Sequence, residues 1–303
     1  MVGKRGNMRY AVYVKGERGF YSLKGLLARK LIPVVCVGEE RERAIAKLCK
    51  KSKIPYIIEK SPGTKAHIVV TNKRKLDLLV CAGYSRILPE ELFLSLRYGA
   101  INCHGGRLPQ YRGASPIPWQ IINGETYGIA YVIKMTKDID NGPMLAQERY
   151  EIKENDTARN ITDKVTKIFY RIVPKVVKLY ASDNPPKGAP QDERDACRWT
   201  RRYPDDGIIA WNRLTAKQVV NLIRALDDPY PGAFLLRKKE KVVIRRARVF
   251  DKLVMGIPGR FIGRTSHGAL ILATDGAVEV LEFAYKGKHF PGNEFPGRYG
   301  ETY

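Results

Sequence analysis

Two polar side chains stand one residue apart where an apolar stretch of the chain ends. Asn102 and His104 close the run that starts at Tyr98, and the Gly-rich segment Gly105 to Pro116 follows them. In extended chain, residues i and i+2 point to the same side, so the carboxamide and the imidazole face one space. We predict a short strand here, next after a buried strand at Leu76 to Cys81. Open α/β sheets bind ligands at the carboxyl ends of their strands, so we predict a binding or catalytic site at the end of this strand.

A single histidine after a strand is more often structural than functional. Here, however, it shares about a dozen residues with a carboxamide, two glycines and Tyr111-Arg112-Gly113, a density that is typical of functional loops. A second polar loop, Lys137 to Gly142, follows the predicted strand Tyr127 to Met135 and supplies carboxylates that can face His104. Taken alone, Asp140-Asn141-Gly142 is more typical of an Asx turn. The two loops together are the candidate site.

The elements that precede this site predict an α/β fold. A β-α-β-α-β series implies a parallel, doubly wound sheet that resembles a Rossmann fold. The turn that we expect at Gly16 to Gly19 lacks the GxGxxG pattern, so no dinucleotide is inferred. The expected strands are Arg9–Val14, Ile32–Val37 and Tyr56–Glu59, and the expected helices are Phe20–Lys30, Glu40–Lys53 and one that starts at Pro89.

The second half of the chain changes from helices to short strands. Helices are expected at 115–123, capped by Ser115, and at 155–180, capped by Asn155 or Asp156. The latter helix has an apolar face of Ile161, Val165, Ile168, Ile172, Val176 and Leu179. After a third helix at 216–226, five alternating segments predict a small β-barrel: 233–236, 241–249, 259–264, 269–274 and 277–284. The tail 286–303 has no regular pattern. We expect a catalytic domain at 1–181, a linker at 182–198 and a second domain at 199–303.

Composition limits the class of protein further. The net charge of +23 suits a polyanionic partner such as tRNA, but a general surface preference, as in thermophiles, explains it equally well. No apolar run approaches the ~20 residues that span a bilayer, and Met1 to Asn7 lacks the apolar core of a leader peptide. Five scattered cysteines suit a reducing cytoplasm, and with only four histidines they leave no credible zinc set. We therefore expect a cytoplasmic protein without membrane insertion and without a metal.

Four motifs, in order and spacing, resemble the folate-dependent formyltransferases. They are Asn102-x-His104, Leu108-Pro109-x-Tyr111-Arg112-Gly113, Ile122-Asn123-Gly124-Glu125 and Asp140-x-Gly142. Two further blocks, 200–211 and 221–234, are similar to the second domain of the methionyl-tRNA and sugar-nucleotide enzymes of this family. The resemblance covers residues 9 to 285. It implies a Rossmann-like, mainly parallel sheet followed by an OB-like β-barrel.

The resemblance also implies a reaction, the transfer of a formyl group from 10-formyltetrahydrofolate to a primary amine. Asn102 would donate a hydrogen bond to the oxyanion, and His104 would accept the amine proton or help to stabilise the oxyanion. Asp140 would orient the imidazole and hold the amine. These three residues are the expected catalytic set.

The same resemblance assigns residues to the cofactor and the substrate. It places the pterin against the main chain of Arg86-Ile87-Leu88 and of Lys137-Asp138-Ile139. Arg112 and Gly113 are expected in the substrate site, although a structural pair between Arg112 and a carboxylate such as Glu125 is an equal alternative.

The acceptor is open between an amino-sugar nucleotide and Met-tRNA. The tRNA enzymes carry a long basic insertion after the second strand, whereas here Val37 leads through three residues into the next helix. The second-domain blocks are similar to those of the enzyme that formylates UDP-4-amino-4-deoxyarabinose, where the Arg after the linker lies near the active site, so Arg201 is a candidate substrate contact. We therefore expect a nucleotide sugar, with Met-tRNA as the alternative that the charge favours. A non-catalytic RNA-binding module is a third hypothesis, and a homodimer is left open.

Overall fold

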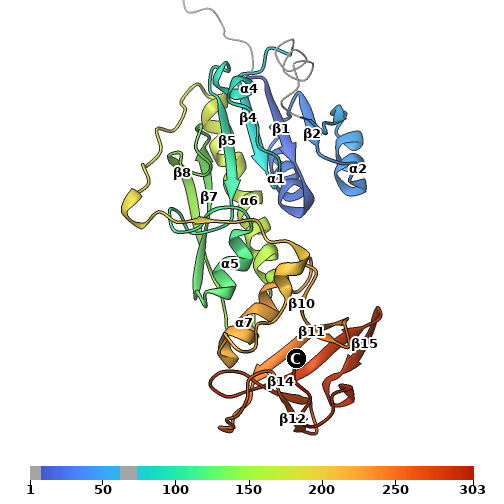
Figure 1. The fold of residues 1–303 in the computed structure, drawn as a ribbon. Helices are drawn as coiled ribbons and strands as arrows, with labels where there is room; N and C mark the ends of the chain where they lie inside the picture. Colours follow the sequence, from blue (N-terminus) through green and yellow to red (C-terminus); the bar gives the residue numbers. More distant parts are fainter. Residues whose placement is uncertain (1–7, 62–73) are drawn as a thin grey trace, which may run out of the picture. The chain divides into compact units, whose positions relative to one another are not determined.

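The chain of this computed structural model is described for residues 8–61 and 74–303, and it divides into two compact units (Figure 1). The first unit consists of Met1–Gly113, Gly128–Tyr150 and Thr162–Arg198. The second consists of Ala114–Tyr127, Glu151–Ile161 and Trp199–Tyr303. The prediction that Met1 to Asn7 lacks a leader peptide falls on residues outside the described ranges. The domain limits drawn from the sequence, at 181 and 199, stay a prediction.

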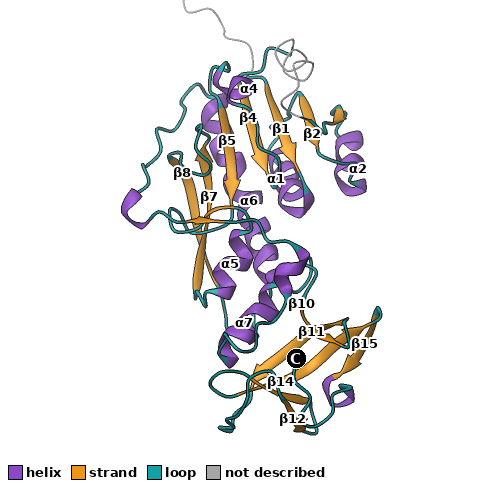
Figure 2. Cartoon of the chain, in the orientation of Figure 1, coloured by secondary structure: helices purple, strands orange, loops and turns teal. Residues whose placement is uncertain are grey.

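A seven-stranded sheet forms the centre of the first unit, in the order β3-β2-β1-β4-β5-β7-β8 (Figure 2). The strands are β1 (Tyr10–Val14), β2 (Val35–Gly38), β3 (Tyr56–Ile58), β4 (Leu78–Ala82), β5 (Ala100–His104), β7 (Tyr127–Lys134) and β8 (Met144–Glu151). Strands β1 to β5 pair in parallel, and β7 runs antiparallel to β5. The chain builds β2 and β3 on one side of β1, then β4 and β5 on the other. This confirms the predicted Rossmann-like, doubly wound, mainly parallel sheet.

Helices cover this sheet, which is why its central strands are apolar throughout. All residues of β1 and of β4 are buried, as expected where helices lie on both faces of a parallel sheet. The helices that the described residues of this unit form are α1 (Gly16–Ala28), α2 (Arg43–Lys51), α4 (Glu90–Leu94) and, from Thr162 on, α6 (Ala158–Ala181). Helix α1 lies directly against α6, because a Cβ at Gly25 would be only 2.4 Å from the carbonyl oxygen of Tyr170.

Three expectations in this unit are wrong. Helix α1 begins at Gly16 and not at Phe20: Gly19 marks close packing instead of a turn, since a Cβ there would lie 2.7 Å from that of Val14. Strand β8 was missed, because a half-exposed edge strand carries little apolar alternation. Leu179 is 40% exposed, whereas the five other residues of the predicted α6 face are buried.

Two predicted helix caps are also corrected. Ser115 precedes α5 (Pro116–Ile122), but its backbone is left-handed (φ 56°) and its side chain caps nothing. Thr157 caps α6 in place of Asn155 or Asp156: Asn160 N donates to Thr157 Oγ1 at 3.4 Å, and Thr157 N donates to Asn160 Oδ1 at 2.9 Å. Asp156 is used one turn earlier, where its carboxylate accepts from Lys153 N at 2.7 Å.

The second unit contains an antiparallel sheet in the order β10-β11-β14-β13-β12, with β15 paired to β14. Its strands are β10 (Ala233–Arg237), β11 (Glu240–Val249), β12 (Phe261–Arg264), β13 (Ala269–Leu272), β14 (Ala277–Tyr285) and β15 (Lys288–Pro291), and its helix α7 (Ala216–Ala225) packs on this sheet and on α5. The five predicted strands are present. The tail, predicted to lack regular structure, forms β15, and it buries Phe295 completely against Phe261 and Phe283. Closure of this sheet into an OB-like barrel stays a prediction.

The remaining elements are short. Strands β6 (Arg112–Gly113) and β9 (Arg198–Trp199) form a separate two-stranded ladder. The 3₁₀ helices are η1 (Glu193–Asp195), η2 (Pro204–Gly207) and η3 (Gly292–Glu294). No helix in the described ranges is long and apolar enough to cross a membrane.

A buried carboxylate in β14 gives the second unit a pH-dependent stability. Glu279 is fully buried, and it accepts hydrogen bonds from Arg248 Nε at 2.6 Å and from the Thr265 hydroxyl. Burial raises the pKa of this carboxyl, but the Thr265 and Arg248 contacts outweigh it and the pKa is lowered. Its stabilisation is therefore present above the unfolded-state value of about 4.3 and is lost as the pH falls through the lower folded-state pKa.

We expect Glu279→Gln to lower the free energy of unfolding by about 2 kcal/mol at pH 7, because a hydrogen-bonded charge is replaced by an amide. The difference from the wild type should shrink as the pH falls below 4. Urea unfolding at pH 7 and pH 3.5 measures both values, and an equal difference at the two pH values would contradict the assignment.

Candidate active site

The structure brings Asn102, His104 and Asp140 together within the first unit. Asn102 and His104 are the third and last residues of β5, and Asp140 lies between β7 and β8. Asn102 Nδ2 donates to Asp140 Oδ1 at 3.0 Å, and His104 Nδ1 is 3.3 Å from Asp140 Oδ2. Gly113 N donates to the same Oδ2 at 2.9 Å. A carboxamide, an imidazole and a carboxylate therefore converge on one point, as the two polar loops predicted.

The loop that carries Asp140 folds back toward β5. Because β7 is antiparallel to β5, Lys134 at its end pairs with Ile101, near the beginning of β5. The chain must then turn, and Asp140 adopts a left-handed backbone (φ 54°) that few residue types tolerate. Gly142 permits the turn, since a Cβ there would lie 1.7 Å from the carbonyl oxygen of Lys134. The motif Asp140-x-Gly142 thus has a steric basis.

Asp140 is ionised although it is nearly buried, with only 9% of its side chain exposed. Burial raises the pKa of this carboxyl. The His104 ring, the Gly113 amide and the Asn102 amide act in the opposite direction, and together they lower the pKa below its usual value. A carboxylate that is held by several donors keeps its negative charge in an apolar setting. The site therefore contains a fixed anion.

Both ring nitrogens of His104 face oxygens that can only accept hydrogen bonds. Nδ1 faces the Asp140 carboxylate, and Nε2 lies 2.7 Å from the carbonyl oxygen of Tyr111. A neutral imidazole has one donor nitrogen, whereas the protonated ring has two. With 4% of the side chain exposed, water is not an alternative partner. The arrangement therefore suits a His104 that donates from both nitrogens and carries a positive charge.

Arg112 is bound within the protein and pairs with Glu193, not with the predicted Glu125. Its Nη1 and Nη2 donate to the two oxygens of Glu193 at 2.9 and 2.6 Å, and its Nε donates to Gln191 Oε1 at 2.9 Å. Only 3% of the Arg112 side chain is exposed. The sequence suggested Glu125 because that residue lies nearby in the chain, whereas the actual partner is 81 residues away.

Gln191 is a site residue that the sequence did not indicate. Its Nε2 donates to the carbonyl oxygens of Asp140 at 2.8 Å and Gly142 at 2.9 Å, and so it fixes the backbone on both sides of Asn141. Through Oε1 it also accepts from Arg112. Gln191 lies in the segment that composition marks as a linker, and no local pattern distinguishes it. It connects the buried Arg112 to the loop of Asp140.

The two segments predicted to contact the cofactor border one hydrophobic cluster. Leu88 belongs to this cluster, and Met135, just before the segment 137–139, packs against it. Each segment also exposes an isoleucine: Ile87 is 76% exposed and Ile139 is 45% exposed. Arg201 lies in the second unit, so its predicted role toward the substrate stays a prediction. Among the residues that the structure describes, no group of three or more metal-ligating side chains gathers, and the five cysteines are free thiols.

Two protein-family models match this chain. Residues 28–177 match the family model described as formyl transferase, and residues 202–297 match the formyl transferase C-terminal domain. A bifunctional polymyxin resistance protein ArnA from Wigglesworthia glossinidia brevipalpis is 31% identical over 250 residues, which are 80% of this chain and 38% of that protein. The chain belongs to the folate-dependent formyltransferase family. It spans 38% of the length of this curated relative.

Solved structures share the fold. WlaRD, a sugar 3N-formyl transferase determined in the presence of dTDP and 5-N-formyl-THF, has a TM-score of 0.69 at 17% identity and covers 94% of this chain and 100% of its own. The methionyl-tRNA formyltransferase of Clostridium thermocellum has a TM-score of 0.57 at 20% identity, covering 82% of this chain and 96% of its own. At these identities the likeness establishes the fold and leaves the acceptor open.

Proposed function

We propose that this protein is an N-formyltransferase that moves a formyl group from 10-formyltetrahydrofolate to the primary amine of an amino-sugar nucleotide. The observation that carries the proposal is the convergence of Asn102, His104 and Asp140. Asn102 donates a hydrogen bond to the Asp140 carboxylate, and His104 forms an ion pair with it. Family membership supports the reaction type, and the relative ArnA and the structure of WlaRD support a sugar acceptor.

Each of the three side chains has a role that its contacts allow. When bound, 10-formyltetrahydrofolate supplies the formyl carbon, and its N10 is the leaving group. Asn102 Nδ2 gives one hydrogen to Asp140 and keeps a second for the negative charge that develops on the formyl oxygen. His104, as a cation beside that charge, stabilises it further. Asp140 accepts a hydrogen bond from the attacking amine and orients its lone pair.

Protons balance within this arrangement. The new bond joins the amine nitrogen to the formyl carbon, the bond from that carbon to N10 breaks, one proton leaves the amine and one is taken up by N10. The Asp140 carboxylate and the His104 ring form a paired acceptor and donor at 3.3 Å. Because both ring nitrogens of His104 already face protein oxygens, Asp140 is the group that can accept the amine proton, and N10 takes up its proton from water.

The main chain of residues 86–88 and 137–139 fits a flat, polar heterocycle. Backbone groups of these loops can hydrogen-bond a pterin edge, and the exposed Ile87 and Ile139 side chains offer apolar contact to its faces. Arg112 is connected to the loop of Asp140 through Gln191, and because its guanidinium is bound to Gln191 and Glu193 we do not assign it a direct contact with substrate. Gly113 contributes its N–H to Asp140.

The identity of the acceptor is tested by offering the protein several candidate amines in separate reactions. Purified protein is incubated with 10-formyltetrahydrofolate and, in turn, UDP-4-amino sugars, dTDP-3-amino or dTDP-4-amino sugars, and Met-tRNA, and the product is scored by the mass of one formyl group. We expect formylation of at least one nucleotide sugar. Formylation of Met-tRNA alone would replace the acceptor and keep the reaction, whereas no product with any amine would contradict the reaction itself.

A basic surface on α2 favours the second candidate, a methionyl-tRNA formyltransferase. A cavity of about 550 Å³ is lined by Arg43, Lys47 and Lys50 of α2, by Arg41 just before this helix, and by Tyr56 and Ile58 of β3. Cations that gather on one helix face attract the phosphate backbone, and such binding weakens steeply with salt. A gel shift with tRNA at two salt concentrations measures this attraction. Affinity that survives the higher salt would support tRNA as the partner.

A further inference from the structure

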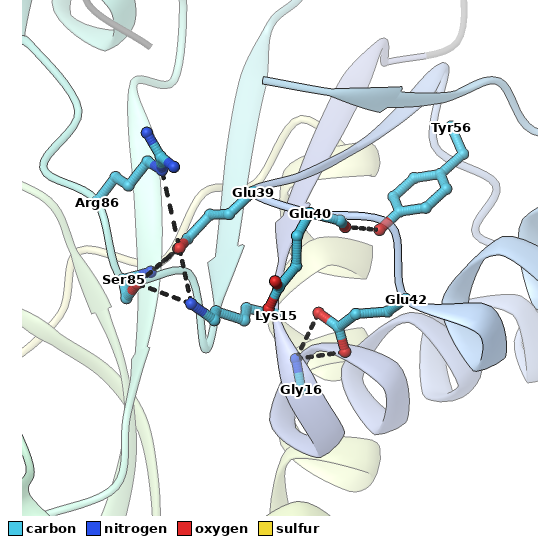
Figure 3. Close-up of polar contacts among 8 residues, drawn as sticks. All are labelled: Lys15, Gly16, Glu39, Glu40, Glu42, Tyr56, Ser85 and Arg86. Atoms are coloured by element: carbon cyan, nitrogen blue, oxygen red, sulfur yellow. Dashed lines mark hydrogen bonds and ion pairs between the residues drawn. The ribbon is translucent and has the colours of Figure 1, made fainter. Parts of the chain in front are cut away.

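A buried carboxylate ties together the three loops at the point where the strand order of the sheet reverses. Glu39 follows β2, Lys15 follows β1, and Ser85 lies in the loop after β4 (Figure 3). Strands β1 and β4 are neighbours, and β2 lies on the other side of β1. This is the position where open α/β sheets bind ligands. Glu39 itself is only 7% exposed.

Glu39 makes its closest contacts with Ser85. Its Oε1 accepts from Ser85 N, and its Oε2 accepts from Ser85 Oγ at 2.7 Å. Lys15 Nζ donates to Oε2 at 2.9 Å, and Arg86 Nε is 3.8 Å from the same oxygen. In Figure 3 these groups surround the carboxylate from two sides. One side chain therefore holds both the backbone and the hydroxyl of a single loop residue.

Such a carboxylate is costly to bury unless its partners satisfy it. Burial raises the pKa of Glu39, and the hydrogen bonds from Lys15 and Ser85 reverse this, so that the pKa is lowered. Glu39 is thus ionised, and it keeps its partners at neutral pH. The contact with Ser85 is a fixed one, and it spans 46 residues of sequence.

The loop that follows is anchored at both ends. Ser85 is bound to Glu39, and three residues later Leu88 is buried in the hydrophobic cluster that includes residues of β1 and β4. Between these anchors Arg86 and Ile87 are exposed, and Ile87 keeps 76% of its surface open. An apolar side chain that is fixed in solvent between two anchored neighbours suits contact with a flat ring. Glu39 is the partner that holds the first of these two anchors.

We propose that Glu39 is a positioning residue for folate: through Ser85 it presents the main chain of residues 86–88 to the pterin. This inference rests on the proposed function. Without the carboxylate the segment samples other conformations, and the apparent dissociation constant rises by the inverse of the fraction that remains competent. The chemical groups on β5 are unchanged, so the loss falls on folate binding and not on the catalytic step.

The test compares Glu39→Gln with Glu42→Gln. Glu42 lies in the same connection between β2 and α2, and both of its oxygens accept from Gly16 N at 3.0 Å, apart from Ser85 (Figure 3). Both variants remove one negative charge and replace one of the two acceptor oxygens of a carboxylate that binds a backbone N–H. We measure the dissociation constant of 5-formyltetrahydrofolate by calorimetry, and kcat and both KM values for the formyl transfer.

We expect Glu39→Gln to raise the dissociation constant and the folate KM by about tenfold, with kcat at saturating folate and the acceptor KM within about twofold of wild type. Glu42→Gln should bind folate like the wild type. Equal folate binding by Glu39→Gln and the wild type would overturn the inference, and so would a fall in kcat alone. If the wild type and Glu42→Gln bind no folate, the proposed function fails instead.

Ser85→Ala tests the same route with a smaller change, and it also decides alone if Glu39→Gln does not fold: an unchanged dissociation constant in Ser85→Ala would then overturn the inference. This change removes only the hydroxyl of an exposed residue and leaves the N–H contact with Glu39 in place. We expect an increase in the dissociation constant of about threefold, and no further increase when it is added to Glu39→Gln, because coupled contacts are not additive. Independent, additive effects would contradict a role for Glu39 through Ser85.

Discussion

Replacing Asp140 by asparagine lowers kcat on the order of 10³-fold, while the protein stays folded. The fixed negative charge and its ion pair with His104 are lost, and the amide keeps one acceptor oxygen where Asn102 and Gly113 each donate to a different oxygen of the carboxylate. The attacking amine loses its partner and the proton loses its path. The measurement is single-turnover formyl transfer at saturating folate, with circular dichroism to establish the fold.

The control for this variant is Asp251→Asn, which removes one negative charge from an exposed position in the second unit. Its kcat should equal that of the wild type. A second readout separates binding from chemistry: the dissociation constant of 5-formyltetrahydrofolate should change little in Asp140→Asn. Turnover of Asp140→Asn near the wild-type value would remove this carboxylate from the mechanism.

Gly142→Ala is expected to reduce kcat on the order of 10²-fold without touching any reacting group. The added methyl carbon would lie 1.7 Å from the carbonyl oxygen of Lys134, and that neighbour is backbone that cannot rotate away. The loop must move, and Asp140, two residues earlier, moves with it. Displacement of a catalytic group by about 1 Å is enough for a loss of this size.

The matched control is Gly276→Ala, because a Cβ at Gly276 meets nothing within 4 Å. It should leave both kcat and the unfolding transition unchanged. Steady-state kinetics and thermal unfolding of the two alanine variants make the comparison. Full activity in Gly142→Ala would mean that the loop can rearrange and still deliver Asp140 to the site.

The fold was predictable from the sequence wherever burial imposes a simple pattern. Strands β1 and β4 are buried on both faces, so they are short apolar runs that the sequence displays directly. Strand β8 is half-exposed at the sheet edge, and its residues carry no such pattern. The start of α1 was misjudged because a glycine that is needed for packing at residue 19 looks the same in sequence as a glycine that is needed for a turn.

The site was predictable only as far as local spacing and family resemblance reach. Asn102 and His104 follow from their alternation in a strand, and Asp140 was added by its motif. Gln191 and Glu39 were not recognised, since their contacts join segments 51 and 46 residues apart and depend on how the chain folds. A supporting residue of this kind has no signature in its own neighbourhood.

Glu193 is a surface residue that is linked to the candidate active site through Arg112 and Gln191 and contacts none of the three proposed catalytic residues directly. This glutamate is 64% exposed, yet it supplies the only carboxylate that the described residues show against the Arg112 guanidinium, which is 3% exposed. Loss of Glu193 would leave the buried Arg112 cation without this carboxylate. Arg112 donates to Gln191, and Gln191 in turn donates to the backbone of Asp140. We therefore expect substitutions of the exposed Glu193 to alter turnover, although this residue lies on the surface.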